Sequence, residues 1–238
     1  MRAAISSEWT KLWTTRTIWW ALLAAFVLMA AAAGQNALYV ENGDVPASSA
    51  GDVAVLSVAI AQLAFVSLAM LVMTSEYSAQ TIRATLSWIP SRGRLLSAKV
   101  VVVAMVTLVG GLIAGLLGGV VAAGILGNSS DIAGDATKIG IYLALLGVLA
   151  TGLAAALRGP VVTLVVLLMV IVVVPPLLQI PDISVLNGIA DAFPGVAGNH
   201  FLSGDSSPYP QAVGLVILMG WTLAAVGVGW RVLKRRDA

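Results

Sequence analysis

The sequence EYSAQTIRATLSWIPSRGRLLSAK, residues 76–99, is the longest polar interruption on the side of the chain that carries the basic residues. It separates two long apolar runs. Inside it, residues 81–89 have the spacing of a short amphipathic helix, because Ile82, Leu86 and Ile89 follow one another at i, i+4 and i+7 on one face. A helix is therefore expected outside the membrane between the second and third apolar runs.

Pro90 ends this expected helix, and residues 91–94 (SRGR) are predicted to form a basic turn before the next apolar run. Two interpretations of the helix are open on spacing alone. Its apolar face could lie on the bilayer while Arg83, Arg92 and Arg94 meet lipid phosphates. Alternatively, the apolar face could fill a groove on a soluble partner, where each buried aliphatic side chain contributes roughly 1.5 to 3 kcal/mol.

The composition of the 238 residues is that of a membrane protein. Hydrophobic residues make up 59% of the chain and charged residues only 10%, whereas a water-soluble domain carries about 25% charged residues. The apolar spans and their connections leave no room for a soluble catalytic domain. The chain has no cysteine, which excludes disulfides and thiolate chemistry.

Six apolar runs are each close to the roughly 20 residues that cross a bilayer as a helix. The expected fold is an all-α integral membrane protein with a single transmembrane domain. A segment before the first run, residues 4–17, has helical amphipathic spacing and is expected to lie at the membrane interface. The expected spans are residues 18–40, 53–75, 100–126, 139–157, 161–180 and 212–232.

In residues 4–17 the spacing is expected to place Ile5, Trp9, Leu12 and Trp13 on one side. The polar residues Glu8, Lys11 and Thr15 are expected mostly on the other side. Arg16 follows this helix, and Trp19 and Trp20 continue the aromatic belt at the start of the first span.

The distribution of positive charge predicts the orientation. With the N-terminus in the cytoplasm, only Lys138 among the 13 lysine and arginine residues lies on the outer side. Such a bias places both termini and the 76–99 loop in the cytoplasm. The outer residues 181–210 form a long connection in which short helices are expected, packed on the outer face or dipping into it.

Proline and glycine mark two further features of the spans. Pro175 and Pro176, near the outer end of the fifth span, should break or kink that helix, either as a simple helix end or as a kink lining a pathway. Gly111, Gly115 and Gly119 repeat every four residues in the third span. They are expected to allow close approach by another helix.

The chain lacks the motifs of several enzyme classes. No phosphate-binding G-x-x-x-x-G-K-[ST] sequence occurs, so ATP hydrolysis by this chain is not expected, and no catalytic or metal-binding residues are predicted. The spans contain almost no ionisable side chains, unlike those of ion-coupled transporters. Gln62, accompanied by Ser57, is the deepest polar side chain. An interhelical hydrogen bond is its expected role, with a substrate contact as the alternative.

The N-terminal sequence SEWTKLWTTRTIWW, together with EYSAQTIRATL and a basic turn after the second span, resembles the ABC-2 type permease subunits of bacterial ABC transporters, particularly actinobacterial ones. The six-span layout agrees along the whole chain. In such permeases the first cytoplasmic loop forms a coupling helix that docks on a separate ATPase subunit. The resemblance implies that the ATPase-docking residues are Glu76, Tyr77, Thr81, Ile82, Arg83, Leu86 and Ile89.

The resemblance also implies a function. Two permease chains, identical or different, would pair in the bacterial plasma membrane, and each would contact an ATPase that binds ATP and Mg²⁺. The uncharged spans favour an amphipathic or hydrophobic cargo such as a drug, antibiotic or lipid-like compound. No nucleic-acid partner is expected. The alternative is a passive channel, scramblase or assembly factor whose loop contacts only lipid.

Overall fold

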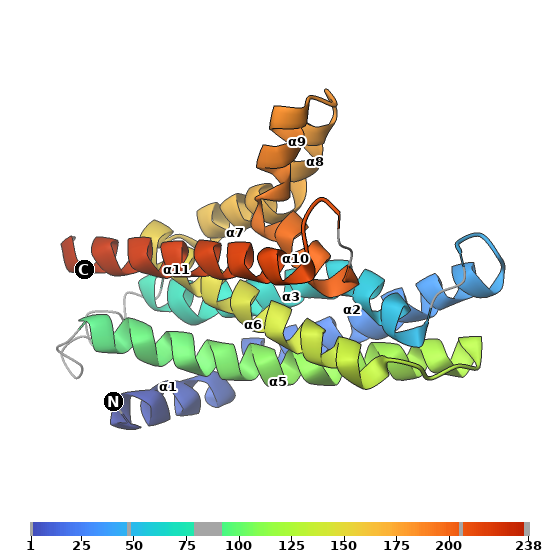
Figure 1. The fold of residues 1–238 in the computed structure, drawn as a ribbon. Coiled ribbons are helices and arrows are strands. Elements are labelled where there is room, and N and C mark those ends of the chain that lie inside the picture. The colour runs from blue at the N-terminus through green and yellow to red at the C-terminus, as the bar shows by residue number, and fades with distance from the viewer. Residues whose placement is uncertain (1, 47–48, 79–91, 205–206, 236–238) are drawn as a thin grey trace.

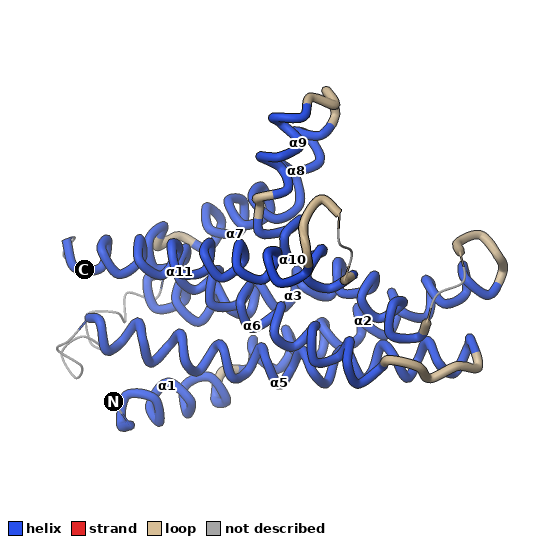
Figure 2. Tube along the Cα trace, viewed as in Figure 1, coloured by secondary structure: helices blue, strands red, loops and turns tan. Residues whose placement is uncertain are grey.

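The computed structural model describes residues 2–46, 49–78, 92–204 and 207–235. These residues form a bundle of helices without any strand (Figures 1 and 2). Six helical segments are long and apolar enough to cross a membrane, which confirms the predicted all-α integral membrane fold. They are α2 (Arg16–Glu41), α3 (Ala50–Ser78), α5 (Arg92–Leu126), α6 (Ile132–Leu157), the segment from α7 (Pro160–Leu168) to α8 (Val174–Gln179), and α11 (Gln211–Arg235).

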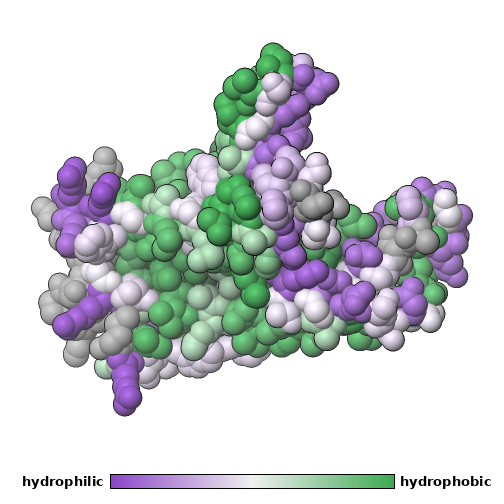
Figure 3. Space-filling model, viewed as in Figure 1, coloured by the Kyte–Doolittle hydropathy of each residue, from purple (hydrophilic) through white to green (hydrophobic). Residues whose placement is uncertain are grey.

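Both marked chain ends lie at the same end of the bundle, where α5 also begins (Figure 1). The helix α1 (Arg2–Thr14) lies beside α5 at this end. Apolar surface covers much of the middle of the bundle, and polar surface gathers towards its two ends (Figure 3). This distribution is expected where hydrocarbon surrounds the middle of the protein and water surrounds its ends.

The fourth span, α6, is the centre of the bundle. It packs against α5, α3 and α11, and residues such as Ile139, Leu143, Leu146 and Ala150 along it are fully buried. The remaining spans turn large apolar side chains outward, which is normal for helices in contact with lipid. The core is therefore built around a helix that touches little lipid.

Small residues allow the closest helix contacts. A Cβ atom at Gly115 of α5 would lie 2.7 Å from the Cα of Ala136 on α6. Gly111 and Gly119 also face α6, so the predicted close approach at this glycine repeat is confirmed. On the other side of α6, a Cβ atom at Gly152 would lie 2.6 Å from the backbone nitrogen of Val226 on α11.

The fifth span bends at its outer end. Between α7 and α8 the backbone forms a π-helical segment, Met169–Val173. Pro175 has no N–H to donate, and its ring would clash with the carbonyl four residues earlier in a regular α-helix. The wider π-helical turn accommodates the proline pair, and the chain then leaves the bundle as a hairpin of α8 and α9 (Ser184–Asp191) (Figure 1).

The outer connection contains the expected short helices. Besides α9, it holds α10 (Pro194–Ser203), which packs on α11 and also contacts α6. Two side-chain hydrogen bonds connect the end of α9 to Tyr209 and to α11. The hydroxyl of Tyr209 donates to the carbonyl of Asp191 at 2.6 Å, and the indole of Trp221 donates to the carbonyl of Ala192 at 2.7 Å.

Two helices begin earlier than hydropathy indicates. The helix of the third span begins at Arg92 rather than at residue 100, so residues 92–94 are helical and the predicted basic turn at this point is wrong. Leu95 and Leu96 are buried in the bundle, which stabilises the helix beyond the membrane. Likewise, α6 begins at Ile132 rather than at residue 139. Hydropathy locates the part of a helix in hydrocarbon, not the helix end.

Candidate functional site

A buried lysine joins three helices at the end of the bundle where the chain begins. Lys99, on α5, is 1% exposed. Its Nζ donates to Glu8 Oε2 of α1 at 2.6 Å, to Glu76 Oε1 of α3 at 2.8 Å, and to the carbonyl of Val72 at 3.1 Å. An ammonium group has three protons to donate, so this geometry uses all of them.

A second lysine completes what we call the charge cluster: Glu8, Lys11, Glu76 and Lys99. Nζ of Lys11 lies 2.9 Å from Glu8 Oε1 and 3.1 Å from Glu76 Oε1. Two cations and two carboxylates make the cluster neutral overall. This pairing offsets the cost of removing the charges from water, which would be several kcal/mol for an unpaired ion.

The charges of the cluster also set the protonation of Lys11, its partly exposed member. Burial alone would lower the pKa of Lys11. The hydrogen bond that Lys11 donates to Glu8 and the negative charges of Glu76 and Glu8 outweigh burial and raise the pKa of Lys11 above its ordinary value of 10.5. Lys11 is therefore a cation at every physiological pH.

The cluster corrects the predicted faces of the N-terminal helix. Glu8 was expected opposite the apolar residues, but Ala4, Glu8 and Leu12 form the buried face of α1. The amphipathic pattern failed here because an ion pair with the buried Lys99 outweighs hydropathy in deciding which face packs inward. Trp9 is exposed, so its predicted position at the membrane interface stays a prediction.

The lysine itself carried the signal that sequence reasoning missed. Lys99 follows Leu95, Leu96 and Ala98 and precedes a long apolar run. A lysine at such a position requires a carboxylate partner when it is buried. Glu8 and Glu76 were candidate partners on the same side of the membrane. They are 91 and 23 residues away from Lys99 along the chain, so the sequence did not indicate which of them contacts it.

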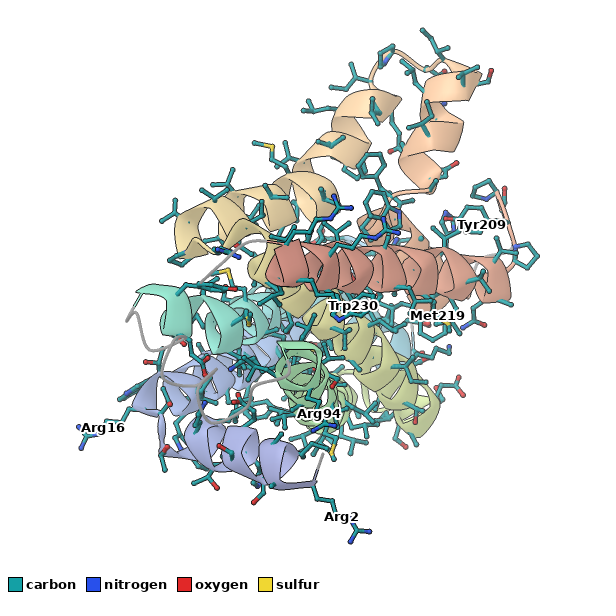
Figure 4. All side chains as sticks on the ribbon, turned by 90° about the vertical axis from the view of Figure 1, so that its left-hand side faces the viewer. Arg2, Arg16, Arg94, Tyr209, Met219 and Trp230 are labelled. Carbon is teal, nitrogen blue, oxygen red and sulfur yellow. The ribbon has the colours of Figure 1, made fainter. Side chains whose placement is uncertain are left out.

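The structure describes both ends of the loop that joins α3 to α5. We call these ends the loop roots: Glu76 and Tyr77 on α3, and Gly93 on α5. At the α3 root, the ring of Tyr77 lies under the guanidinium of Arg158, with the Arg158 Cζ 5.4 Å from the ring centroid. At the α5 root, Gly93 lies against Trp230 of α11, whose indole nitrogen would be 3.0 Å from a Cβ atom at this position. Figure 4 shows Arg94 and Trp230 at this end of the bundle.

These contacts connect the loop roots to α1, α5, α11 and the link between α6 and α7. Glu76 reaches α1 and α5, Tyr77 reaches the link between α6 and α7, and Gly93 reaches α11. The carboxylate of Glu76 is directed to the charge cluster, so its contact with an ATPase stays a prediction. The other predicted docking residues, Thr81, Ile82, Arg83, Leu86 and Ile89, lie outside the described residues.

The predicted interfacial residues are spread between α1 and α2. Leu12 is buried in the main core. The rings of Trp9 and Trp13 meet edge to face, with centroids 5.6 Å apart, and Trp13 also contacts Trp19 of α2 with centroids 4.9 Å apart. Arg16 begins α2, and its side chain points away from the bundle (Figure 4).

The polar residues predicted for a pathway make interhelical hydrogen bonds. Gln62 of α3 accepts a hydrogen bond from the hydroxyl of Tyr142 on α6, which confirms the expected interhelical role. Ser57 of α3 accepts one from Asn36 of α2 at 3.1 Å. Pro175 is buried and Pro176 exposed at the bend of the fifth span, so a contact of these residues with cargo stays a prediction.

The described residues contain no group of three or more histidine, aspartate or glutamate side chains that could hold a metal ion. His200 stacks on Tyr209, with ring centroids 4.8 Å apart. The site that remains is the charge cluster with the loop roots. Its geometry joins α1, α3 and α5 through the ion pairs of Lys99 with Glu8 and Glu76.

Six apolar spans and a charge cluster at the root of one connecting loop define a multi-pass membrane protein. The sequence matches the ABC-2 family transporter proteins over residues 4–180, from α1 to the end of the fifth span, and the chain belongs to this family. It is therefore a transmembrane component of an ABC transporter, a class that works with an ABC ATPase. The comparison with curated proteins gives no match.

Proposed function

We propose that this chain is an exporter permease that receives the force of ATP hydrolysis through the 76–99 loop and the charge cluster. The single observation that carries the proposal is that Lys99 binds Glu8 and Glu76 at once, at 2.6 and 2.8 Å. Glu76 is three residues before the segment 79–91, and Lys99 is eight residues after it. Force applied to that segment reaches α1, α3 and α5 together.

The docking element in this proposal is the amphipathic helix predicted over residues 81–89. Its apolar residues Ile82, Leu86 and Ile89 would fill a groove on the ATPase, with Arg83, Tyr77 and Thr81 beside them. ATP and Mg²⁺ would be bound by the ATPase and not by this chain. When two ATPase subunits close on ATP, each would push one such helix.

The orientation in the proposal follows from charge. Both chain ends and the loop roots lie at one end of the bundle (Figure 1), and 12 of the 13 lysine and arginine residues fall on that side of the predicted spans. The positive-inside rule puts this end in the cytoplasm. The location proposed is the bacterial plasma membrane.

The proposed cargo class rests on the near absence of ionisable side chains within the spans. Among the described residues, the buried carboxylates and the buried lysine, namely Glu8, Glu76, Asp135 and Lys99, lie on α1 or towards the ends of spans. No residue between 53 and 75, between 100 and 126, or between 139 and 157 is ionisable apart from the buried tyrosine Tyr142. Such spans suit an amphipathic or hydrophobic compound, carried between two paired permease chains.

Co-purification with a candidate ABC ATPase subunit tests the docking step. The double variant Ile82→Asp/Leu86→Asp places two charges on the apolar face and should lose the ATPase while inserting normally. The matched variant Ile82→Val/Leu86→Met keeps that face apolar and should retain it. Equal ATPase recovery with both variants would overturn the docking proposal.

Transport in proteoliposomes containing the ATPase tests whether ATP drives transport and which class of cargo is carried. ATP should drive accumulation of an amphipathic dye, and removal of Mg²⁺ should stop it. A small hydrophilic solute as the only cargo would contradict the cargo class. Uptake of the dye without any ATPase would favour the passive alternative.

A further inference from the structure

An apolar groove of about 560 Å³ runs between α1, α2 and α5 on the outer surface of the bundle. At one end it is lined by Trp9, Trp13 and Trp19. From there it extends along α2 and α5 to Phe26 and Ile113. All of its lining side chains are apolar or aromatic, apart from a glycine.

The depth of the groove can be followed along α5. Its lining residues on this helix lie between Met105 and Ile113, in the middle of a helix that runs from Arg92 to Leu126. They span about 12 Å at 1.5 Å per residue. The groove thus starts at the tryptophans near the end where both termini lie, and it reaches towards the middle of the bilayer.

The tryptophan end is a fixed structure. The indole nitrogen of Trp19 donates a hydrogen bond to the carbonyl of Trp13 at 3.0 Å, which ties α2 to α1 across the bend at Thr15. The ring contacts of Trp13 with Trp9 and with Trp19 strengthen this connection. Tryptophans favour the headgroup layer of a membrane, so the mouth of the groove lies at that level.

Positive charge lies beside the mouth. On α2, Arg16, Trp19 and Leu23 occupy positions i, i+3 and i+7, so Arg16 is on the groove face one turn closer to the cytoplasm. On α1, Arg2 and Trp9 are seven residues apart and share a face. Both arginines point away from the bundle (Figure 4). The carboxylate of α1, on Glu8, is bound by Lys99 and Lys11 and faces inward.

We propose that this groove binds an anionic phospholipid of the cytoplasmic leaflet. One acyl chain lies along α2 and α5 beneath the tryptophans, and the phosphate is held by Arg16. Charge complementarity selects this occupant, because a cationic mouth joined to an uncharged, membrane-buried groove matches an anionic headgroup joined to a hydrocarbon tail. The proposal does not depend on the docking of an ATPase.

Native mass spectrometry of the purified full-length chain tests the proposal. The protein is incubated with phosphatidylglycerol or phosphatidylcholine that carry identical acyl chains, and the retained lipid is counted. Wild-type protein should retain more phosphatidylglycerol. Arg16→Gln should lower that retention by about fivefold, the factor that one basic residue contributes near an anionic surface. Arg235→Gln, which removes an exposed arginine from the far end of α11, should leave it unchanged.

A second pair of variants tests the tail site. Ile113→Trp fills the groove and should abolish retention of both lipids. Val216→Trp places the same side chain on an exposed part of α11 and should not. Leu23→Trp, which fills the groove from α2, repeats the test if Ile113→Trp does not insert into the membrane.

Three results would overturn the proposal. Equal losses in Arg16→Gln and Arg235→Gln would show that lipid is held by net charge alone. Equal retention in Ile113→Trp and Val216→Trp would place the lipid outside the groove. If Ile113→Trp instead converts a dimer into a monomer in the same spectra, the groove is an interface between copies of this chain.

Discussion

Nζ of Lys99 lies 2.6 Å from Oε2 of Glu8, although 91 residues separate the two along the chain. Both side chains are almost completely buried. This ion pair fixes the first helix against the third span, and Glu76 adds the second span to the same contact. The N-terminal helix is thus attached to the bundle, and its predicted position at the membrane interface stays a prediction.

Removing the buried Lys99 should destabilise the fold. Lys99→Met leaves Glu8 and Glu76 close together in a buried position, and breaking a buried pair in this way costs about 3 to 5 kcal/mol. Denaturant titration of the purified protein measures this cost. The double variant Glu8→Gln/Lys99→Met should lose less than the sum of the single variants, by about 0.5 to 3 kcal/mol. Additive losses would show that the two residues act independently.

Glu8→Gln should reduce ATP-driven transport without weakening the binding of the ATPase. The amide can still accept a hydrogen bond from Lys99, but it no longer supplies a full charge, so α1 is held more weakly. Because the predicted docking helix is unchanged, the ATPase should still co-purify while ATP-driven transport falls. Thr10→Gln, on the exposed face of α1, is the control and should retain both properties. Loss of ATPase binding in Glu8→Gln would place Glu8 in the docking surface.

The buried hydrogen bond between Tyr142 and Gln62 should contribute modestly to stability. Tyr142→Phe removes the donor and leaves Oε1 of Gln62 buried, and interhelical hydrogen bonds in membranes average about 0.6 kcal/mol with a maximum of about 1.7. Unfolding in a detergent titration measures the effect. Adding Gln62→Leu to Tyr142→Phe should recover part of the loss, since no buried polar group is then unpaired. No recovery would indicate that the ring contacts matter more than the hydrogen bond.

Gly152→Ala should push α11 away from α6. A Cβ atom there would be 2.6 Å from a backbone nitrogen that cannot rotate aside, and such overpacking costs about 1 to 3 kcal/mol. Gly220→Ala is the matched control on α11, where no heavy atom lies within 4 Å of the added carbon. That variant should be neutral or slightly stabilising, because alanine favours a helix over glycine. The unfolding midpoint of Gly152→Ala should therefore fall, while that of Gly220→Ala should stay the same or rise.

The attachment of α1 should weaken in alkali. The pKa of Lys11 is raised in the folded protein, so its contribution is complete below the unfolded value of about 10.5 and is lost as the pH rises through the higher folded value. Thermal unfolding measured from about pH 8 upward should show this loss at the alkaline end. Lys11→Met should remove part of the alkaline slope. An identical slope in wild type and variant would mean that Lys11 does not contribute.

The sequence by itself determined the class of fold. Apolar runs of about 20 residues have no alternative to spanning helices, because hydrocarbon offers no partner for unpaired backbone groups. The sequence also located the bend, from the proline pair Pro175 and Pro176, and the close helix contact at Gly115, from the repeat of glycines. Each of these depends on a local property of the backbone or on the length of one segment.

Only the tertiary structure decided how polar groups pair. Which helix Gly115 meets, which hydroxyl Gln62 accepts from, and which carboxylates Lys99 binds depend on residues far away in the chain. The orientation of α1 was wrong in the sequence analysis for this reason. Its helical spacing predicted Glu8 on the side opposite the apolar residues, but a charged Lys99 removed from water requires compensating carboxylates. That requirement turns Glu8 inward and leaves Trp9 exposed.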